Sequence, residues 1–219
     1  MPRLTVDIWS DVVCPWCYIG KRRFEAALAR FEHRDDVSVT WHSFELDPDA
    51  PPVHEGAPAE RLAAKYGMSV AEAEARQAEV TGLAALEDLS YDLAGARGGN
   101  TFDAHRLIHL GAEHGLGDAV KERLLRGYFT EREPIGDRDA LVRLAVDAGL
   151  PEAEVRATLE GDRYADAVRA DERTAMQLGI RGVPFFVLDR KYGLSGAQPP
   201  DVILQALEQA WREAEPAAA

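Results

Sequence analysis

The feature that most constrains this chain of 219 residues is Cys14-Pro15-Trp16-Cys17, which contains its only two cysteines. Two thiols separated by two residues have the spacing of a dithiol that forms and breaks a disulfide. The spacing therefore predicts a redox pair.

The surrounding sequence places this pair between a strand and a helix. Residues 4–9 alternate apolar and polar side chains, as a half-buried strand does, and apolar residues recur at helical spacing over residues 24–31. Cys14 is then expected at or just before a helix N-terminus, where the helix dipole and free backbone N–H groups stabilise a thiolate. Pro15 suits the first helical turn. Cys17 lies one turn further in, which suits a resolving thiol. Asp11 is expected to be the N-cap, and modulation of Cys14 is the alternative role.

Two other interpretations of the cysteines remain open. Paired cysteines also bind zinc, but the chain has no second Cys-x-x-Cys, and none of its six histidines follows at zinc-finger spacing. His105 and His109 are spaced i, i+4, but no glutamate follows His105 as a metalloprotease motif requires. Ordinary buried cysteines are the second alternative. We favour the redox pair and expect no metal site.

Composition narrows the class of protein. With 46% hydrophobic and 29% charged residues, the chain is expected to fold as a globular protein, and no apolar run approaches the ~20 residues of a membrane span. The net charge of −13 argues against nucleic acid as a partner. The N-terminus has no apolar segment of the secretory type, so we expect a cytoplasmic location, where a cysteine pair is typically catalytic or redox-sensing.

The periodicity along the chain predicts a split organisation. A second strand is expected at 37–44, and a segment with three prolines follows at 45–53. From about 58 to 178 the pattern is almost wholly helical, with Ser69 and Glu72 as a capping box. We therefore predict a discontinuous domain, 1–55 with 170–219, that is interrupted by a helical domain at 56–169.

A second motif follows the helical stretch. In Val183-Pro184-Phe185-Phe186 a proline stands at the beginning of an apolar strand, where proline is tolerated and is often cis. A short strand or loop is expected at 194–197, and a terminal helix at 201–211.

Together these segments resemble the thioredoxin fold in its DsbA-like form, and within it the FrnE-like proteins. The resemblance runs from about residue 5 to 211 and implies an α/β (α+β) fold. In that fold a large all-helical insertion separates an N-terminal βαβ part from a C-terminal ββα part. Its most specific segments are Asp11 to Cys17, Asn100-Thr101-Phe102-Asp103-Ala104-His105-Arg106-Leu107, the Val183-Pro184 motif and Ser195-Gly196-Ala197-Gln198.

The resemblance implies separate roles for the residues of the cysteine motif. Cys14 would be the exposed nucleophile and Cys17 the buried resolving cysteine, while Pro15 and Trp16 would help to set the redox poise and contact substrate. In periplasmic DsbA the intervening dipeptide ends in His, whose charge favours the thiolate. Trp16 supplies no charge, so a strongly oxidising poise is not expected here.

Other substrate-binding residues follow from the same resemblance. Pro184 would be a cis-proline that faces the dithiol, and the backbone of Val183 would pair with an extended substrate segment. Asn100, Thr101 and His105 would line a substrate cleft beside the thioredoxin-like core.

The expected function is thiol–disulfide exchange through a mixed disulfide, as an oxidase, a reductase or an isomerase. The substrate would be a thiol or disulfide, either protein or small molecule. No cofactor is expected beyond the Cys14–Cys17 disulfide and a low-molecular-weight thiol as co-substrate, and the protein would be a monomer or homodimer. The alternative is an enzyme similar to kappa-class glutathione transferases or 2-hydroxychromene-2-carboxylate isomerases. Those proteins typically carry Ser at the first cysteine position and lack the second cysteine.

Overall fold

The computed structural model describes residues 3–214. Its backbone packing divides the chain into two compact units. Unit 1 runs up to Leu46 and resumes at Arg169, and unit 2 comprises residues 47–168. No helix within the described residues is long and apolar enough to cross a membrane.

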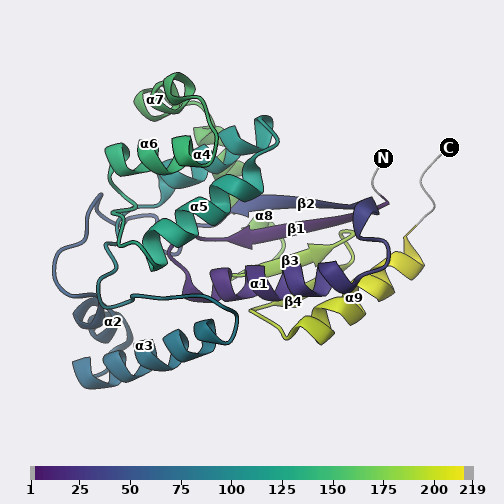
Figure 1. Ribbon diagram of the computed structural model, residues 1–219, viewed down its shortest axis with the longest axis horizontal. Helices are drawn as coiled ribbons and strands as arrows, with labels where there is room; N and C mark the ends of the chain where they lie inside the picture. The colour runs from purple at the N-terminus through teal and green to yellow at the C-terminus, as the bar shows by residue number, and fades with distance from the viewer. Residues whose placement is uncertain (1–2, 215–219) are drawn as a thin grey trace. The chain divides into compact units, whose positions relative to one another are not determined.

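Unit 1 is built on a mixed sheet of four strands (Figure 1). The strand order is β2-β1-β3-β4, in which β1 pairs parallel with β2 and antiparallel with β3, while β3 and β4 are antiparallel. At the centre, Ile8 lies beside Trp41 on one neighbour and Phe186 on the other. The strands are β1 Leu4–Ser10, β2 Val37–Ser43, β3 Phe185–Leu188 and β4 Tyr192–Ser195.

One face of this sheet is covered by α1 (Pro15–Arg30) and α9 (Pro200–Glu213), both drawn on the same side in Figure 1. The alternation in β1 explains this packing, because every second residue points to the same face. The resulting core contains Leu4, Val6 and Ile8 of β1, Phe24 and Ala27 of α1, and Ile203 and Leu207 of α9.

The opposite face receives the part of α8 (Ala165–Gln177) that belongs to unit 1. Trp9 and Val187, which alternate with Ile8 and Phe186, form a second cluster there with Ala175 and Ile180. A short 3-10 helix, η1 (Arg34–Asp36), precedes β2. The chain thus has an N-terminal βαβ half and a C-terminal ββα half, with a helical insertion between them in the sequence. This order of elements confirms the predicted fold class.

Unit 2 is all-helical in its regular structure. Helices α4 to α7 pack against one another in neighbouring pairs, whereas α2 and α3 form a hairpin around Ala59, Ala63 and Ala73. The predicted capping box is confirmed, since Ser69 and Glu72 satisfy each other's backbone N–H groups at the beginning of α3. The helices are α2 Pro58–Tyr66, α3 Val70–Ala85, α4 Phe102–Glu113, α5 Gly117–Phe129, α6 Arg138–Asp147 and α7 Glu152–Glu160.

Candidate active site

The two cysteines lie where β1 passes into α1. Cys14 is the N-cap residue of α1 and has extended backbone angles, and Pro15 occupies the first helical turn, where a missing N–H costs nothing. The N–H of Cys17 donates to the carbonyl oxygen of Cys14 at 3.0 Å. Both cysteines are free thiols in this structure. The sequence prediction of a helix beginning at the motif is therefore confirmed, and the Cys14 thiol stands at the positive end of the helix dipole.

The wall opposite Cys14 is formed by the loop before β3. The Cys14 thiol donates to the carbonyl oxygen of Val183, with Sγ 3.4 Å from that oxygen. The Val183–Pro184 peptide bond is cis, as the sequence predicts. The ring of Pro184 packs on α1 so closely that a Cβ at Gly20 would lie 2.8 Å from its Cγ. The two motifs singled out in the sequence thus meet in space.

The exposure of the motif differs from expectation at one residue. Trp16 is 39% exposed, whereas Cys17, expected to be buried, is 2% exposed. Cys14, expected to be the exposed nucleophile, is only 4% exposed, because its side chain turns toward the Val183 carbonyl instead of toward solvent. An attack on a substrate disulfide therefore requires the thiol to leave this carbonyl.

Asp11 holds the turn that leads to Cys14, and its predicted role as N-cap is wrong. The helix begins three residues later than that role requires, and the carboxylate of Asp11 is directed elsewhere. One oxygen accepts from the N–H of Val12 at 2.7 Å, and the other accepts from the N–H of Leu46 at 2.8 Å. At 1% exposure, Asp11 ties the turn to the segment that follows β2.

Comparison with known proteins agrees with this geometry. The family model described as a DSBA-like thioredoxin domain matches residues 5–208. The chain belongs to the DsbA-like thioredoxin domain family. It is 29% identical over 204 residues to the uncharacterized protein YwbO of Bacillus subtilis, which covers 92% of this chain and 94% of YwbO.

Solved structures of the DsbA-like family and of its fold give the same picture. A probable DsbA oxidoreductase from Streptomyces coelicolor is 51% identical with a TM-score of 0.93, covering 99% of this chain and 93% of that one. The cytosolic disulfide reductase DsbM from Pseudomonas aeruginosa with GSH shares the fold at 21% identity and a TM-score of 0.66, over 95% and 99% of the two chains. A 2-hydroxychromene-2-carboxylate isomerase shares the fold at 13% identity and a TM-score of 0.67, over 95% and 97%.

Unit 1 also contains a partly buried polar triad that the sequence did not reveal. His42 of β2 lies between two carboxylates, with Nδ1 2.7 Å from Asp171 and Nε2 2.8 Å from Asp7. Burial alone would lower the pKa of His42, but the hydrogen bonds and charges of Asp171 and Asp7 outweigh it and raise the pKa to about 9. Trp9 stacks on the imidazole at 4.4 Å between ring centroids. His42 is therefore charged at neutral pH.

The predicted substrate-binding residues of the helical insertion lie at the beginning of α4. The side chain of Asn100 accepts from the N–H of Phe102 at 2.9 Å and donates to the carbonyl of Pro48 at 3.1 Å. Thr101 is the N-cap residue, and both Thr101 and His105 are buried, at 3% and 1% exposure. Asn100 thus joins two loops of unit 2, while a role in substrate binding for these three residues stays a prediction.

Arg106, which follows His105 in the same motif, has a structural role in unit 2. Its buried guanidinium donates to the carbonyl oxygens of Thr158, Gly161 and Arg163, at or beyond the last turn of α7, and pairs with Asp103. These contacts satisfy carbonyl groups that a helix end leaves without partners.

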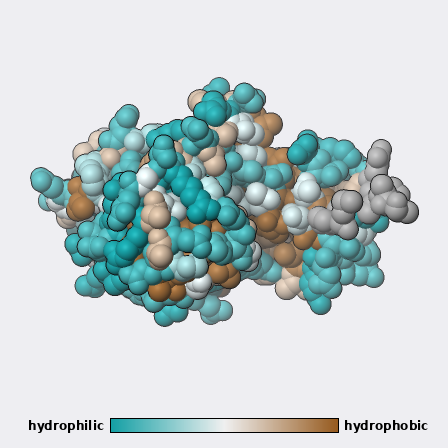
Figure 2. Space-filling view, turned by 90° about the horizontal axis from the view of Figure 1, so that it is seen from above, coloured by the Kyte–Doolittle hydropathy of each residue, from teal (hydrophilic) through white to brown (hydrophobic). Residues whose placement is uncertain are grey.

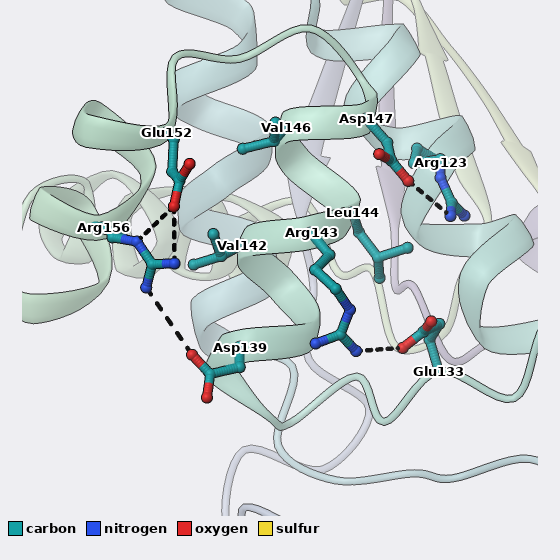
Figure 3. A pocket seen from close by; sticks show the side chains of 10 residues that line it. All are labelled: Arg123, Glu133, Asp139, Val142, Arg143, Leu144, Val146, Asp147, Glu152 and Arg156. Carbon is teal, nitrogen blue, oxygen red and sulfur yellow. Dashed lines mark hydrogen bonds and ion pairs between the residues drawn. The ribbon is translucent and has the colours of Figure 1, made fainter.

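A hollow on unit 2 is lined mainly by paired charges. It has a volume of about 600 Å³ and lies around α6, where Figure 3 shows three arginines, each paired with a carboxylate. The pairs are Arg123 with Asp147, Arg143 with Glu133, and Arg156 with Glu152 and Asp139. Its lining has four acids and three arginines and no cysteine or histidine, so it has no thiol, no imidazole and no excess of positive charge.

The face of the molecule seen in Figure 2 is mostly hydrophilic, and the described residues form no metal site. Teal side chains cover most of the face seen in Figure 2, in keeping with a charged fraction of 29%. Within residues 3–214, no three His, Cys, Asp or Glu side chains are grouped so that they could hold a metal ion.

Proposed function

We propose that this protein is a thiol–disulfide oxidoreductase in which Cys14 attacks and Cys17 resolves. The observation that carries the proposal is the position of the Cys14 thiol, at the N-terminus of α1 and 3.4 Å from the Val183 carbonyl beside Pro184. Membership of the DsbA-like family and 51% identity to a probable DsbA oxidoreductase support it. Within the family we assign the chain to the FrnE-like proteins, on the motifs given above.

The chemistry needs only these two thiols and a substrate disulfide. The Cys14 thiolate attacks one substrate sulfur, so that a mixed disulfide forms and the other substrate sulfur leaves as a thiolate. Cys17 then loses its proton and attacks Cys14, which releases the second substrate thiolate and leaves the Cys14–Cys17 disulfide. Two electrons pass from the protein to the substrate, and each released thiolate takes up a proton. The reverse sequence oxidises a dithiol substrate.

The backbone around Cys14 supports both directions of exchange. Cys14 is the N-cap residue of α1, so the positive end of the helix dipole stabilises the negative sulfur. The Val183 carbonyl holds the protonated thiol and is freed when the thiolate forms, and the backbone of Val183 is then open to an extended substrate segment. Pro15, exposed Trp16 and Pro184 supply the surrounding contact surface. A low-molecular-weight thiol in a reducing compartment is the proposed co-substrate that regenerates the pair.

The test is reduction of a protein disulfide such as that of insulin. Cys14→Ser is expected to reduce turnover to background. Its matched partner Cys17→Ala is also inactive in turnover but is expected to accumulate a mixed disulfide, because Cys14 still attacks and nothing resolves the adduct. Mass spectrometry of the trapped adduct separates the two variants. Unchanged turnover in Cys14→Ser would overturn the proposal.

Two further measurements separate this function from its alternative and give its direction. A glutathione-dependent transferase or isomerase would still turn over an electrophilic substrate after Cys14→Ala with Cys17→Ala, whereas an oxidoreductase would not. A redox titration of the Cys14–Cys17 couple against glutathione then shows whether the pair donates or accepts electrons.

A further inference from the structure

The segment that follows β2 is fastened to α8 by charged groups. The N–H of Ser43 donates to the carboxylate of Asp171 at 2.8 Å. Two residues further on, Arg169 donates to Glu45 at 2.6 Å and to Glu172 at 2.7 Å, so that one guanidinium bridges two carboxyl groups. All of these contacts lie within unit 1.

The two carboxyl groups have more oxygen atoms than this arginine satisfies. The side chain of Glu45 is fully buried, at 0% exposure, and that of Glu172 is 18% exposed. In each, Oε2 accepts from Arg169, while Oε1 is buried and has no hydrogen-bond partner among the described residues. Both Oε2 atoms contact the same nitrogen of Arg169, Nη1, so the two carboxyl groups are direct neighbours. Two ionised carboxylates are both acceptors and repel one another, whereas a single proton lets one group donate to the other.

We propose that Glu45 and Glu172 share one proton and that this proton makes the attachment of the Glu45–Leu46 segment to α8 sensitive to pH. Through this segment, α8 controls the turn that carries Cys14. With the proton in place, the carboxyl pair and Arg169 hold the segment against α8. Loss of the proton leaves two buried negative charges against a single guanidinium, which loosens the segment.

The path from this pair to the thiol is short and continuous. Leu46 directly follows Glu45, and its N–H donates to Asp11. Asp11 also accepts from the N–H of Val12, and its carbonyl oxygen accepts from the N–H of Cys14 at 3.4 Å. Movement at Glu45 therefore reaches Cys14 through backbone hydrogen bonds and one buried carboxylate. The shared proton stands independently of any activity, whereas its consequence for catalysis rests on the proposed function.

The surrounding charges set the pKa of Glu45 within the physiological range. Burial raises the pKa of Glu45, the charge of Arg169 lowers it and the charge of Glu172 raises it. The resulting pKa of Glu45 is about 7. The neighbouring charged groups of the other elements are paired among themselves or with backbone donors: His42 of β2 with Asp7 of β1 and Asp171 of α8, and Asp11 with Val12 and Leu46.

The first test is a pH titration of the carboxyl groups in the full chain. The infrared carbonyl band of the protonated carboxylic acid is the signal that is measured. We expect a band that disappears with a midpoint near pH 7 and that is lost in Glu45→Gln. Glu172→Gln is expected to move the midpoint downward, because it removes a repelling charge, and Arg169→Gln to move it upward, because it removes an attracting one. Glu208→Gln, at an exposed position of α9, is the control and leaves the band unchanged.

The second test reads the effect at the thiol in a Cys17→Ala background, where Cys14 is the sole cysteine. The rate at which iodoacetamide alkylates Cys14 is expected to rise near pH 7 by at least about fivefold more than ionisation of the thiol alone would give. A factor of this size corresponds to a modest coupling free energy between two sites. Glu45→Gln removes this extra step and leaves the rise due to the thiol.

The outcomes separate this inference from the proposed function. Opposite shifts in Glu172→Gln and Arg169→Gln together with loss of the alkylation step support it. A carboxyl midpoint near the ordinary value of 4.5, or an unchanged midpoint in Glu172→Gln, overturns the shared proton. An alkylation profile that is the same with and without Glu45 overturns the link to Cys14. Cys14-dependent reduction of insulin is unaffected by either failure.

Discussion

The two units of this protein place different kinds of charge in their interiors. In unit 1, His42 lies between Asp7 and Asp171, and its pKa is raised to about 9. In unit 2, Arg106 is 2% exposed and donates to backbone carbonyls around the end of α7. An imidazole gains or loses its proton within the range in which proteins work, whereas a guanidinium keeps its charge throughout.

This difference separates two uses of a cation that is held by several acceptors. The guanidinium of Arg106 replaces hydrogen bonds that a helix end lacks, so its contribution to the free energy of unfolding is constant with pH. The imidazole of His42 and the carboxyl of Glu45 contribute stability that changes with pH, and both lie in the unit that carries the cysteines. We infer that the stability of unit 1, which carries the thiols, responds to pH and that the contacts of Arg106 do not.

The largest expected effect comes from Arg106→Met. This change leaves carbonyl oxygens of Thr158, Gly161 and Arg163 buried without their donor, which costs about 3–5 kcal/mol of the free energy of unfolding. Urea denaturation at pH 6 and at pH 9.5 should show the same loss. Arg126→Met, at a side chain that is 63% exposed, is the control and should cost far less. A loss that differed between the two pH values would contradict the comparison.

The second effect is the pH dependence of stability through His42. Its pKa is raised from 6.5 to about 9, so the folded state holds a proton that the unfolded state releases between these values. The stabilisation is fully present below pH 6.5 and is lost as the pH rises through 9, by roughly 3 kcal/mol. Glu45 also has a raised pKa, so its contribution is likewise lost as the pH rises, but in the window from 4.5 to about 7.

His42→Gln separates these two windows. The variant should be less stable than the parent below pH 6.5, and its free energy of unfolding should be nearly flat between pH 7 and 9. Its decrease between pH 4.5 and 7 should remain, because Glu45 is unchanged. Chemical denaturation at closely spaced pH values measures both windows, and a decrease of the parental size above pH 7 in His42→Gln would rule out His42 as its source.

The fold was predictable because its signals are local. Alternation identified β1, apolar spacing identified α1, and Ser69 with Glu72 marked the beginning of α3. The helical stretch 58–178 was predicted only as a whole, and the end of α7 within it depends on tertiary contacts with Arg106 of α4. The prediction for Asp11 failed for a related reason: its partner Leu46 is 35 residues away, and nothing near Asp11 in the sequence indicates it.

The residues of the candidate site likewise fall into those that the sequence indicates locally and those that only the fold brings together. Cys14, Cys17 and Pro184 were found because each belongs to a short motif whose spacing has a chemical reason. The polar contacts that α8 makes with β2 and the segment after it were not predicted, because Asp171 meets His42 across 129 residues and Arg169 meets Glu45 across 124. Side chains of ordinary type at such separations leave no periodic signal, and only the folded sheet with α8 brings them together.

A smaller effect is expected where α1 contacts Pro184. A Cβ at Gly20 would lie 2.8 Å from Cγ of the Pro184 ring, which cannot rotate away. Gly20→Ala should therefore reduce the free energy of unfolding by about 1–3 kcal/mol and lower exchange activity by displacing the wall opposite Cys14. Gly182→Ala, where an added Cβ meets nothing within 4 Å, is the control. Equal stability of the two variants would show that Pro184 does not pack on α1 in this way.

The smallest effect has the opposite sign and lies in unit 2. Gly82 occupies an exposed interior position of α3, and an added Cβ would meet nothing within 4 Å. Gly82→Ala should stabilise α3 by about 0.5–1 kcal/mol, because alanine loses less backbone entropy than glycine in a helix. Because α3 packs mainly on α2 through small alanine side chains, we expect the gain as slower hydrogen exchange within residues 70–85 and not in β1 or α1.

Gly67→Ala is the matched control on the same hairpin: its φ of 65° strains any side chain, so exchange should become faster there. Slower exchange around Cys14 in Gly82→Ala would mean that stability is shared between the units, and the separation of a pH-responsive core from a pH-independent one would then fail.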